Sequence, residues 1–125
     1  MNDCIFCKII KGDIPSKKVY EDDNVIAFMD INPQVDGHTL VVPKKHLVDF
    51  TELESKDLDN IFNVAKKLTP MLMKAVNAEA FTSCYNYGNS QEVKHFHLHL
   101  LPNYGVSLPK TNIEEVYDKI KEIEI

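Results

Sequence analysis

The sequence predicts one α+β domain, with a mainly antiparallel sheet of about five strands, one long helix and two shorter helices. Short apolar segments alternate with turn-forming residues, the segment 95–101 has a period of two residues, and one long segment has a helical period. The resulting order is helix, three strands, long helix, two strands, helix. A length of 125 residues suits a single hydrophobic core. We therefore expect one domain over residues 1–125, with its core at about 4–105 and a last helix at about 112–123.

The first third of the chain contains the first helix and three strands. Residues 4–11 are mostly apolar and should form one or two helical turns that end at Gly12. Three short runs of apolar and β-branched residues then follow, at 18–21, 25–29 and 38–42. The first two should form a hairpin around an Asp-Asp-Asn turn, and Pro43 should end the third.

The longest helix follows, with Ser55 as its expected N-cap. Its apolar residues recur with a helical period at Leu58, Ile61, Phe62, Ala65, Leu68, Leu72, Ala75 and Val76. Pro70 lies inside this pattern, and we expect it to kink or split the helix.

The last third of the chain contains two strands and a final helix. The strands are expected at 80–85 and 95–101, with a polar loop at 86–94 between them. Thr111 and Glu114 resemble a capping box that opens the final helix.

Composition limits the possible partners. The apolar content of 44% and the charged content of 26% are values of a globular protein. A net charge of −5 argues against an extended surface for nucleic acid or for anionic membranes, although a small phosphorylated ligand needs only local donors. No segment approaches membrane-spanning length, and residues 1–8 have neither a basic lead nor a secretory hydrophobic core. We expect a cytoplasmic protein.

The segment His95-Phe96-His97-Leu98-His99 carries most of the chemistry. Its alternation should turn Phe96, Leu98 and Leu100 into a core and place the three histidines together on the opposite face. A neutral imidazole can attack phosphorus, and a second one can protonate the leaving group. The preceding loop, 86–92, is rich in amide and hydroxyl donors that suit a phosphate. A purely metal-binding pair of histidines is the alternative.

Two of the three cysteines form a Cys4-x-x-Cys7 pair, which in a cytosolic protein indicates metal binding or redox activity. Structural zinc favours four Cys and His ligands, so His46 and one histidine of the triad could complete a set. The alternative is that both cysteines pack as small apolar residues. Cys84 lies in a predicted strand, where burial is expected.

These motifs together resemble those of the histidine triad (HIT) family, whose signature is three histidines that alternate with apolar residues. Residues 95–101 match it position by position, and similar blocks occur at 5–10, 14–15, 20–22, 27–31 and 37–46. The chain looks most like the small bacterial members of the nucleotide-binding branch. The resemblance implies a five-stranded antiparallel sheet and a homodimer in which the two sheets are continuous.

The resemblance also implies an activity. The family hydrolyses or transfers nucleoside monophosphate groups, typically adenylyl, from phosphoramidates, acyl-nucleotides or dinucleoside polyphosphates. By position, His97 would be the nucleophile that forms a nucleotidyl-histidine intermediate, and His99 would contact the phosphate and aid departure of the leaving group. His95 and His38 would belong to the same network.

The implied ligand is a purine nucleotide (AMP, GMP or an adenosine conjugate), and the implied cofactor is structural zinc. Asp30 would accept the ribose hydroxyls. The base would lie among Phe6, Ile9, Phe28 and Ile31. The α-phosphate would lie near Asn86, Gln91, Glu92 and Val93. Zinc would be held by Cys4, Cys7, His46 and His95.

Several positions depart from the family pattern. The 86–91 loop is about two residues short of many relatives, Ser90 replaces a usual Gly, and Asn103 replaces a common Arg. Glu92 stands where some members have a phosphate-binding Ser or Thr, and its carboxylate would repel an anionic ligand. Two alternatives to the enzyme therefore stay open: a nucleotide- or partner-binding module with weak or vestigial catalysis, and a zinc-stabilised scaffold. Retention of both His97 and His99 favours the enzyme.

Overall fold

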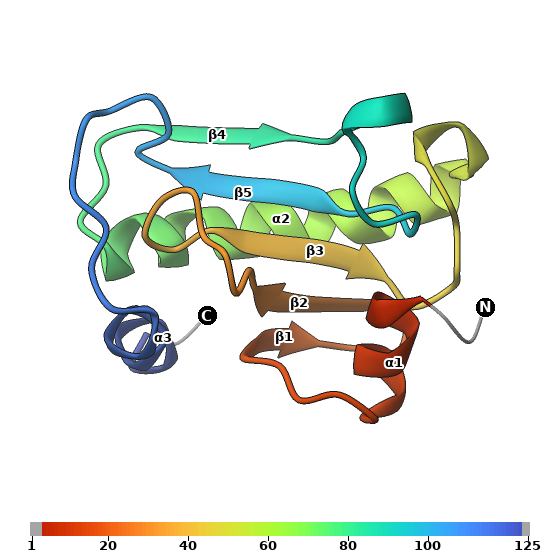
Figure 1. Cartoon of the computed structure of the whole chain (residues 1–125), viewed down its shortest axis with the longest axis horizontal. Helices are drawn as coiled ribbons and strands as arrows, with labels where there is room; N and C mark the ends of the chain where they lie inside the picture. The colour runs from red at the N-terminus through yellow and green to blue at the C-terminus, as the bar shows by residue number, and fades with distance from the viewer. Residues whose placement is uncertain (1–3, 124–125) are drawn as a thin grey trace.

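The computed structural model describes residues 4–123 and has an open five-stranded sheet with helices packed around it (Figure 1). The strands lie in the order β1-β2-β3-β5-β4, and all four neighbouring pairs are antiparallel. Their bounds are β1 Lys18–Glu21, β2 Val25–Met29, β3 Thr39–Pro43, β4 Phe81–Cys84 and β5 Leu98–Pro102. The predicted α+β class is confirmed. Residues 1–3 of the start segment and residues 124–125 lie outside the described residues.

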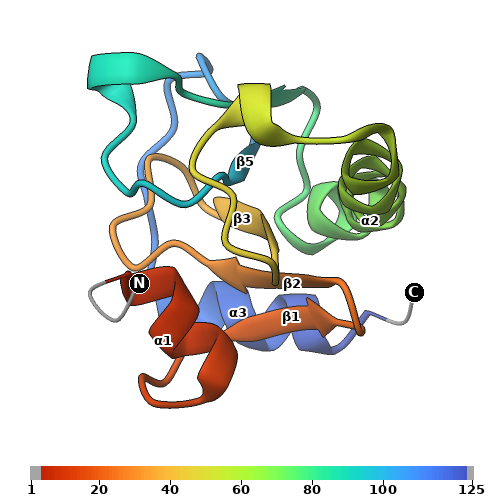
Figure 2. The ribbon, with the colours of Figure 1, turned by 90° about the vertical axis from the view of Figure 1, so that its right-hand side faces the viewer.

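Three α-helices accompany the sheet: α1 Ile5–Lys11, α2 Ser55–Ala75 and α3 Ile113–Lys121. Two short 3-10 helices, η1 Phe50–Glu52 and η2 Gly88–Ser90, lie in the loops before α2 and after β4. Seen along the sheet, α2 lies on one side while α1 lies near the opposite face (Figure 2). Within the described residues, no helix is long and apolar enough to cross a membrane.

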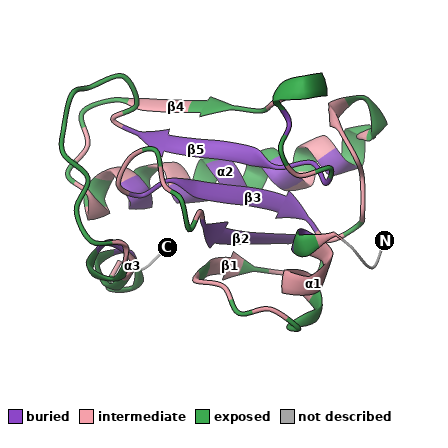
Figure 3. Cartoon of the chain, in the orientation of Figure 1, coloured by how far each residue is buried: buried purple, intermediate pink, exposed green. Residues whose placement is uncertain are grey.

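The central strands are buried on both faces, as the colours of Figure 3 show for β2, β3 and β5. The side chains of alternate residues of β2 pack in two different hydrophobic cores. Val25, Ala27 and Met29 join the core beneath α2, whereas Ile26 and Phe28 join a smaller core with Phe6 of α1. Phe96, Leu98 and Leu100 belong to the α2 core, as predicted. The side chains of alternate residues point to opposite faces, so the triad histidines lie on the α1 face.

Helix α2 differs from the expectation in three ways. Its N-cap is Glu54 and not Ser55, because the backbone N–H of Glu54 bonds to the Asp57 carboxylate at 2.9 Å. Pro70 does not split the helix. The one N–H that Pro70 lacks would serve the carbonyl of exposed Lys66, which water can satisfy, while the neighbouring residues pack on the sheet. Phe62, placed in the apolar face, is 44% exposed.

Other boundaries also differ. Strand β5 begins at Leu98, so His95 and His97 precede the strand, and β3 and β4 are shifted or shortened by one residue at their ends. Asn112, not Thr111, caps α3, since its side-chain oxygen accepts from the N–H groups of Glu114 and Glu115. The Thr111 hydroxyl instead donates to Asp36 at 2.8 Å. Cys84 is exposed, contrary to expectation, because β4 is an edge strand.

Candidate functional site

The triad histidines lie at the start of β5, where His99 is opposite Leu40 of β3 and His95 and His97 directly precede the strand. His95, His97 and His99 are 0%, 7% and 9% exposed, so all three are buried. Helix α1 covers them, and its Phe6 ring meets the His97 ring edge-on with the two centroids 5.0 Å apart. The rings of His97 and His99 are 4.9 Å apart between centroids, which places two imidazoles within reach of one ligand.

The hydrogen bond of His97 shows which of its two ring nitrogens carries the proton and which keeps a lone pair. Its Nδ1 lies 2.8 Å from the backbone oxygen of His95. A carbonyl can only accept, so Nδ1 carries the proton and Nε2 keeps its lone pair. Burial lowers the pKa of His97, although this hydrogen bond and the carboxylates of Asp30 and Glu92 act in the opposite direction. His97 is therefore neutral near pH 7, with Nε2 available for attack.

A second chain of hydrogen bonds fixes the proton of His99. The backbone N–H of Gln34 donates to Nδ1 of His38 at 3.1 Å, so His38 is protonated at Nε2. This Nε2–H donates to Nδ1 of His99 at 2.9 Å, which leaves the His99 proton on Nε2. Burial, together with the neighbouring His97 and His38, lowers the pKa of His99 to about 4. His99 is thus a neutral N–H donor beside the neutral His97, whose Nε2 keeps its lone pair.

An apolar cavity of about 240 Å³ opens beside these two histidines. Its lining includes nine residues predicted for the site: Phe6, Ile9, Phe28, Asp30, Ile31, Glu92, Val93, His97 and His99. Ser16, Asn32 and Leu40 also line the cavity and were not predicted. Ser16 and Asn32 directly follow the family-like blocks 14–15 and 27–31, and Leu40 lies inside the block 37–46, so proximity to these blocks was the signal that could have found them.

Two predicted phosphate contacts have other partners. The side-chain amide of Gln91 is buried and donates to the Val48 carbonyl at 2.6 Å, which ties the 86–94 loop to the segment before η1. The Asn86 amide donates to the Ser90 hydroxyl at 3.3 Å. Neither residue lines the cavity, and their contact with an α-phosphate stays a prediction.

The structure brings the predicted metal ligands together. The sulfurs of Cys4 and Cys7 and a nitrogen of His46 and of His95 all lie within 4.8 Å of one another. His95 donates from Nε2 to the Pro43 carbonyl at 2.8 Å, so the lone pair on its Nδ1 is free. That nitrogen lies 3.4 and 3.5 Å from the two sulfurs, and His46 Nδ1 lies 3.2 Å from Cys7 Sγ.

These separations fit a metal ion. Tetrahedral bonds of about 2.3 Å to sulfur and about 2.05 Å to nitrogen would place S and N ligands roughly 3.5 Å apart. Burial and the adjacent Cys4 raise the pKa of the Cys7 thiol, so a cation would be needed to hold the Cys7 sulfur as a thiolate near neutral pH. Two thiolates and two neutral imidazoles form a donor set suited to a closed four-coordinate site.

A second group with suitable residue types is not arranged for a metal. Asp30, His38 and His99 also lie within 4.8 Å of one another. However, His38 already accepts from Gln34 at Nδ1, so its Nε2 presents a proton and no lone pair. Asp30 lies 3.6 Å from this nitrogen. We interpret the group as a hydrogen-bond relay that orients His99.

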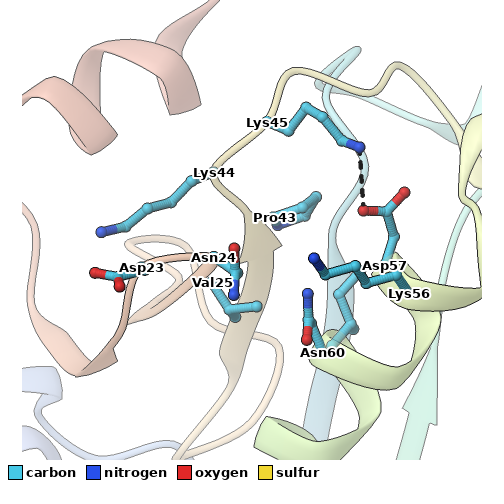
Figure 4. A pocket seen from close by; sticks show the side chains of 10 residues that line it. Asp23, Asn24, Val25, Pro43, Lys44, Lys45, Lys56, Asp57 and Asn60 are labelled. Carbon is cyan, nitrogen blue, oxygen red and sulfur yellow. Dashed lines mark ion pairs between the residues drawn. The ribbon is translucent and has the colours of Figure 1, made fainter.

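A separate cavity of about 220 Å³ lies between the end of β3 and the first turn of α2 (Figure 4). Lysines and carboxylates line it together, and Lys45 pairs with Asp57 at 3.3 Å. It includes none of the histidines or cysteines described above. We therefore do not count it as part of the candidate site.

A family model described as the HIT domain matches residues 11–106, which span β1 to β5 and the triad. The chain belongs to the HIT family. This confirms the resemblance inferred from the sequence.

Relatives of this HIT protein are known from several organisms. An uncharacterized HIT-like protein of Methanocaldococcus jannaschii is 48% identical over 103 residues, which cover 81% of this chain and 79% of that protein. An adenosine 5′-monophosphoramidase of Schizosaccharomyces pombe is 38% identical over 135 residues, which cover 94% and 98% of the two chains. The crystal structure of a Zn-bound histidine triad family protein from Mycobacterium smegmatis gives a TM-score of 0.87 at 30% identity, covering 97% of this chain and 92% of that one.

Proposed function

We propose that this HIT protein cleaves nucleoside-monophosphate linkages, with adenylyl as the typical group, through a covalent intermediate on His97. The observation that carries the proposal is the 2.8 Å bond from His97 Nδ1 to the His95 carbonyl. It leaves the nucleophilic Nε2 free on a neutral ring beside an apolar cavity that contains Asp30. The similarity to an adenosine 5′-monophosphoramidase supports the same reaction class.

The reaction would have two balanced steps. In the first, His97 Nε2 forms a bond to the α-phosphorus, the bond from phosphorus to the leaving group breaks, and its electron pair departs with that group. The departing nitrogen accepts a hydrogen bond from the Nε2–H of neutral His99 and takes its proton from a water molecule, which becomes hydroxide. In the second step a water molecule attacks phosphorus, the bond to His97 breaks with its electron pair returning to Nε2, and the proton that the attacking water loses neutralises the hydroxide. The products are the nucleoside monophosphate and the protonated leaving group.

The cavity suggests how the nucleotide would bind. A purine would lie among Phe6, Ile9, Phe28 and Ile31, whose side chains line the cavity. The Asp30 carboxylate would accept the ribose hydroxyls, and charge-assisted hydrogen bonds of this kind contribute about 1.5–3 kcal/mol. AMP, GMP and adenosine conjugates would all satisfy these contacts.

We also propose that Cys4, Cys7, His46 and His95 hold zinc. The similarity to a Zn-bound histidine triad protein supports this assignment. When bound, zinc would supply cross-linking and not reaction chemistry, since four protein ligands leave no open position. The ligands would link the start of α1 to His95, and thereby hold Phe6 against His97.

We further propose a homodimer in which two copies pair along β4. This strand is at one edge of the sheet, and its outer backbone groups are available to a second strand. Exposed apolar side chains follow it directly, at Tyr85 and Tyr87. A second copy would extend the sheet and cover this edge.

Intact-mass spectrometry tests the reaction. The protein would be mixed briefly with adenosine 5′-phosphoramidate, quenched by denaturation at neutral pH, and weighed. We expect a mass increase of one adenylyl group in the wild type, none in His97→Gln, and release of AMP with time. Binding of AMP without an adduct and without turnover would instead identify the binding module.

A further inference from the structure

A second cavity adjoins the proposed nucleotide cavity. It has a volume of about 410 Å³ and is lined by Cys4, Ile5, His46, Val48, Glu92, Val93 and Lys94. Ile5, Glu92 and Val93 line both cavities and form their common boundary. A nucleotide with its base in the first cavity and its phosphorus at His97 would therefore have a continuous path toward the second.

Glu92 is the one charged side chain among the three residues of this boundary. Among the described residues, none of the ion pairs involves Glu92, which is exposed. Lys94 also lines the second cavity, but its ammonium donates to the carbonyls of Gly88 and Gln91 at 3.0 and 2.9 Å. The carboxylates of Glu92 and Asp30 lie near enough to His97 to oppose the effect of burial on its pKa. The phosphorus position is thus flanked by two negative groups.

We propose that the second cavity receives the leaving group and that Glu92 makes the protein selective for leaving amines that carry a positive charge. The inference rests on the proposed function and narrows its substrate class to phosphoramidates of basic amines. A second nucleotide joined through a polyphosphate would bring several negative charges against Glu92. A cationic chain would instead pair with this carboxylate, and the polar backbone of the 86–94 loop would accept its N–H groups.

The expected effect is moderate, because Glu92 is exposed and water screens its charge. Exposed ion pairs usually change an equilibrium by no more than about fivefold, and a comparison of an ammonium with a carboxylate substrate combines one attraction with one repulsion. Such a difference is enough to rank substrates that share the same reacting bond. It should also decline as salt increases, since the Debye length shortens to about 3 Å at molar ionic strength.

The test uses three adenosine 5′-phosphoramidates with leaving amines of matched chain length, whose far ends carry an ammonium, a methyl or a carboxylate group. The phosphorus–nitrogen bond is the same in all three. The measured quantity is kcat/KM, because it reports all steps up to release of the amine even where hydrolysis of the intermediate limits kcat. We expect the wild type to favour the ammonium over the carboxylate substrate at least about fivefold at low salt.

Substitutions at Glu92 test whether its carboxylate causes the preference for the ammonium substrate. Glu92→Gln should bring the ratio to within about twofold of unity, and Glu92→Lys should reverse it. Glu92→Asp keeps the charge and should keep the direction of the preference. The control is Glu79→Gln, which makes the same charge change at an exposed residue outside both cavities and should leave the wild-type ratio.

The outcomes separate the two hypotheses. Cleavage of all three substrates with equal kcat/KM in the wild type would overturn the selectivity and leave the proposed reaction intact. A wild-type preference that persists in Glu92→Gln would overturn the assignment to Glu92. Failure to cleave any of the three would contradict the proposed function itself.

Discussion

At the scale of single residues, the three triad histidines differ because their ring nitrogens have different partners. His95 uses one nitrogen on the Pro43 carbonyl and turns the other to the cysteines. His97 uses Nδ1 on the His95 carbonyl. His99 accepts at Nδ1 from His38. One residue type is thus fixed in three different protonation patterns, which suit the proposed roles of metal ligand, nucleophile and N–H donor, and each proton position follows from a fixed neighbour.

Replacement of the nucleophile is the most direct test at this scale. His97→Gln should lower kcat by at least about a hundredfold, because no other group supplies the attacking lone pair. Nucleotide affinity should stay within about threefold, since the apolar contacts and Asp30 are unchanged. Single-turnover kinetics and calorimetric titration with AMP measure the two quantities. A variant that kept more than about a tenth of the wild-type kcat would contradict the assignment.

The neutral state of His99 predicts how stability depends on pH. Its pKa is lowered from 6.5 to about 4, so between these values the unfolded chain binds a proton that the folded chain does not. This group therefore lowers the free energy of unfolding as pH falls, by about 1.4 kcal/mol per pH unit within that window. Urea unfolding from pH 7 to 5 should show a steeper loss for the wild type than for His99→Gln. Parallel curves would show that His99 does not remain neutral when the protein folds.

At the scale of elements, α1 positions one residue in the Cys–His cluster and another beside the triad. It places Cys7 in the cluster of Cys and His side chains, where the thiol lies 3.2 Å from His46 Nδ1, and it packs the Phe6 ring edge-on against the His97 ring. The helix has only seven residues, which is too short to be stable by itself in water. Its position must therefore depend on contacts with the rest of the protein, and a metal ion would provide the strongest of them.

A double substitution tests this dependence. The wild type should contain about one zinc per chain, and Cys4→Ser combined with Cys7→Ser should remove it and lower the melting temperature. KM should rise because Phe6 loses its support, while kcat at saturating substrate should persist. Cys84→Ser is the control, since Cys84 lies on β4 outside the cluster. Elemental analysis that still found about one zinc in the double variant would refute the ligand set.

The loop before β3 provides a test of backbone geometry. Gly37 has a φ of +87°, and a Cβ there would lie 3.1 Å from Pro102 and 3.3 Å from Val76. Gly12 has nearly the same φ, +88°, with nothing within 4 Å. Gly12→Ala should therefore lose about 1–2 kcal/mol of unfolding free energy, and Gly37→Ala about 1–3 kcal/mol more. Urea titration of both variants measures the difference, and equal losses would exclude the predicted clash.

The sequence predicted the type and order of the helices and strands more accurately than the residues at which they begin and end. Short runs of apolar and β-branched residues located all five strands, because strands that are buried on both faces, such as β2 and β3, have apolar side chains at nearly every position. The predicted helix N-caps were wrong by one residue where two polar residues that can cap a helix are adjacent. At Thr111 and Asn112 the choice depends on Asp36, which is 75 residues away in the chain and accepts from Thr111. Local sequence does not record such a contact.

The candidate site also has features that the sequence predicted and features that it could not predict. Residue types and family resemblance identified nine of the side chains that line the cavity and the four Cys and His residues that cluster. The groups that set the protons of the histidines are backbone atoms: the Gln34 N–H and the carbonyls of Pro43 and His95. Every residue has these atoms, so no sequence pattern could reveal them. Only the fold shows which of them meet an imidazole.

At the scale of the whole molecule, the two edge strands of the sheet differ in how far other segments of the chain cover them. The β1 edge is held by α3, where the Tyr117 hydroxyl donates to the Lys18 carbonyl at 2.9 Å and Lys17 pairs with Glu114 at 2.7 Å. The β4 edge is formed by a strand of four residues whose last two are exposed. An uncovered edge exposes unpaired backbone groups that favour association with another strand. The asymmetry between the edges is the physical argument for the proposed dimer.

Light scattering after gel filtration, in reducing buffer, measures the association. The wild type should have twice the chain mass of 14.3 kDa over micromolar concentrations. Cys84→Lys places a charge on the β4 edge and should shift the mass toward that of one chain, because a buried unpaired ammonium opposes strand pairing. Asn24→Lys adds the same charge at the turn between β1 and β2 and should leave the dimer intact. A wild type with the mass of one chain would refute the dimer, and dissociation by both substitutions would mean that net charge, and not the β4 edge, controls association.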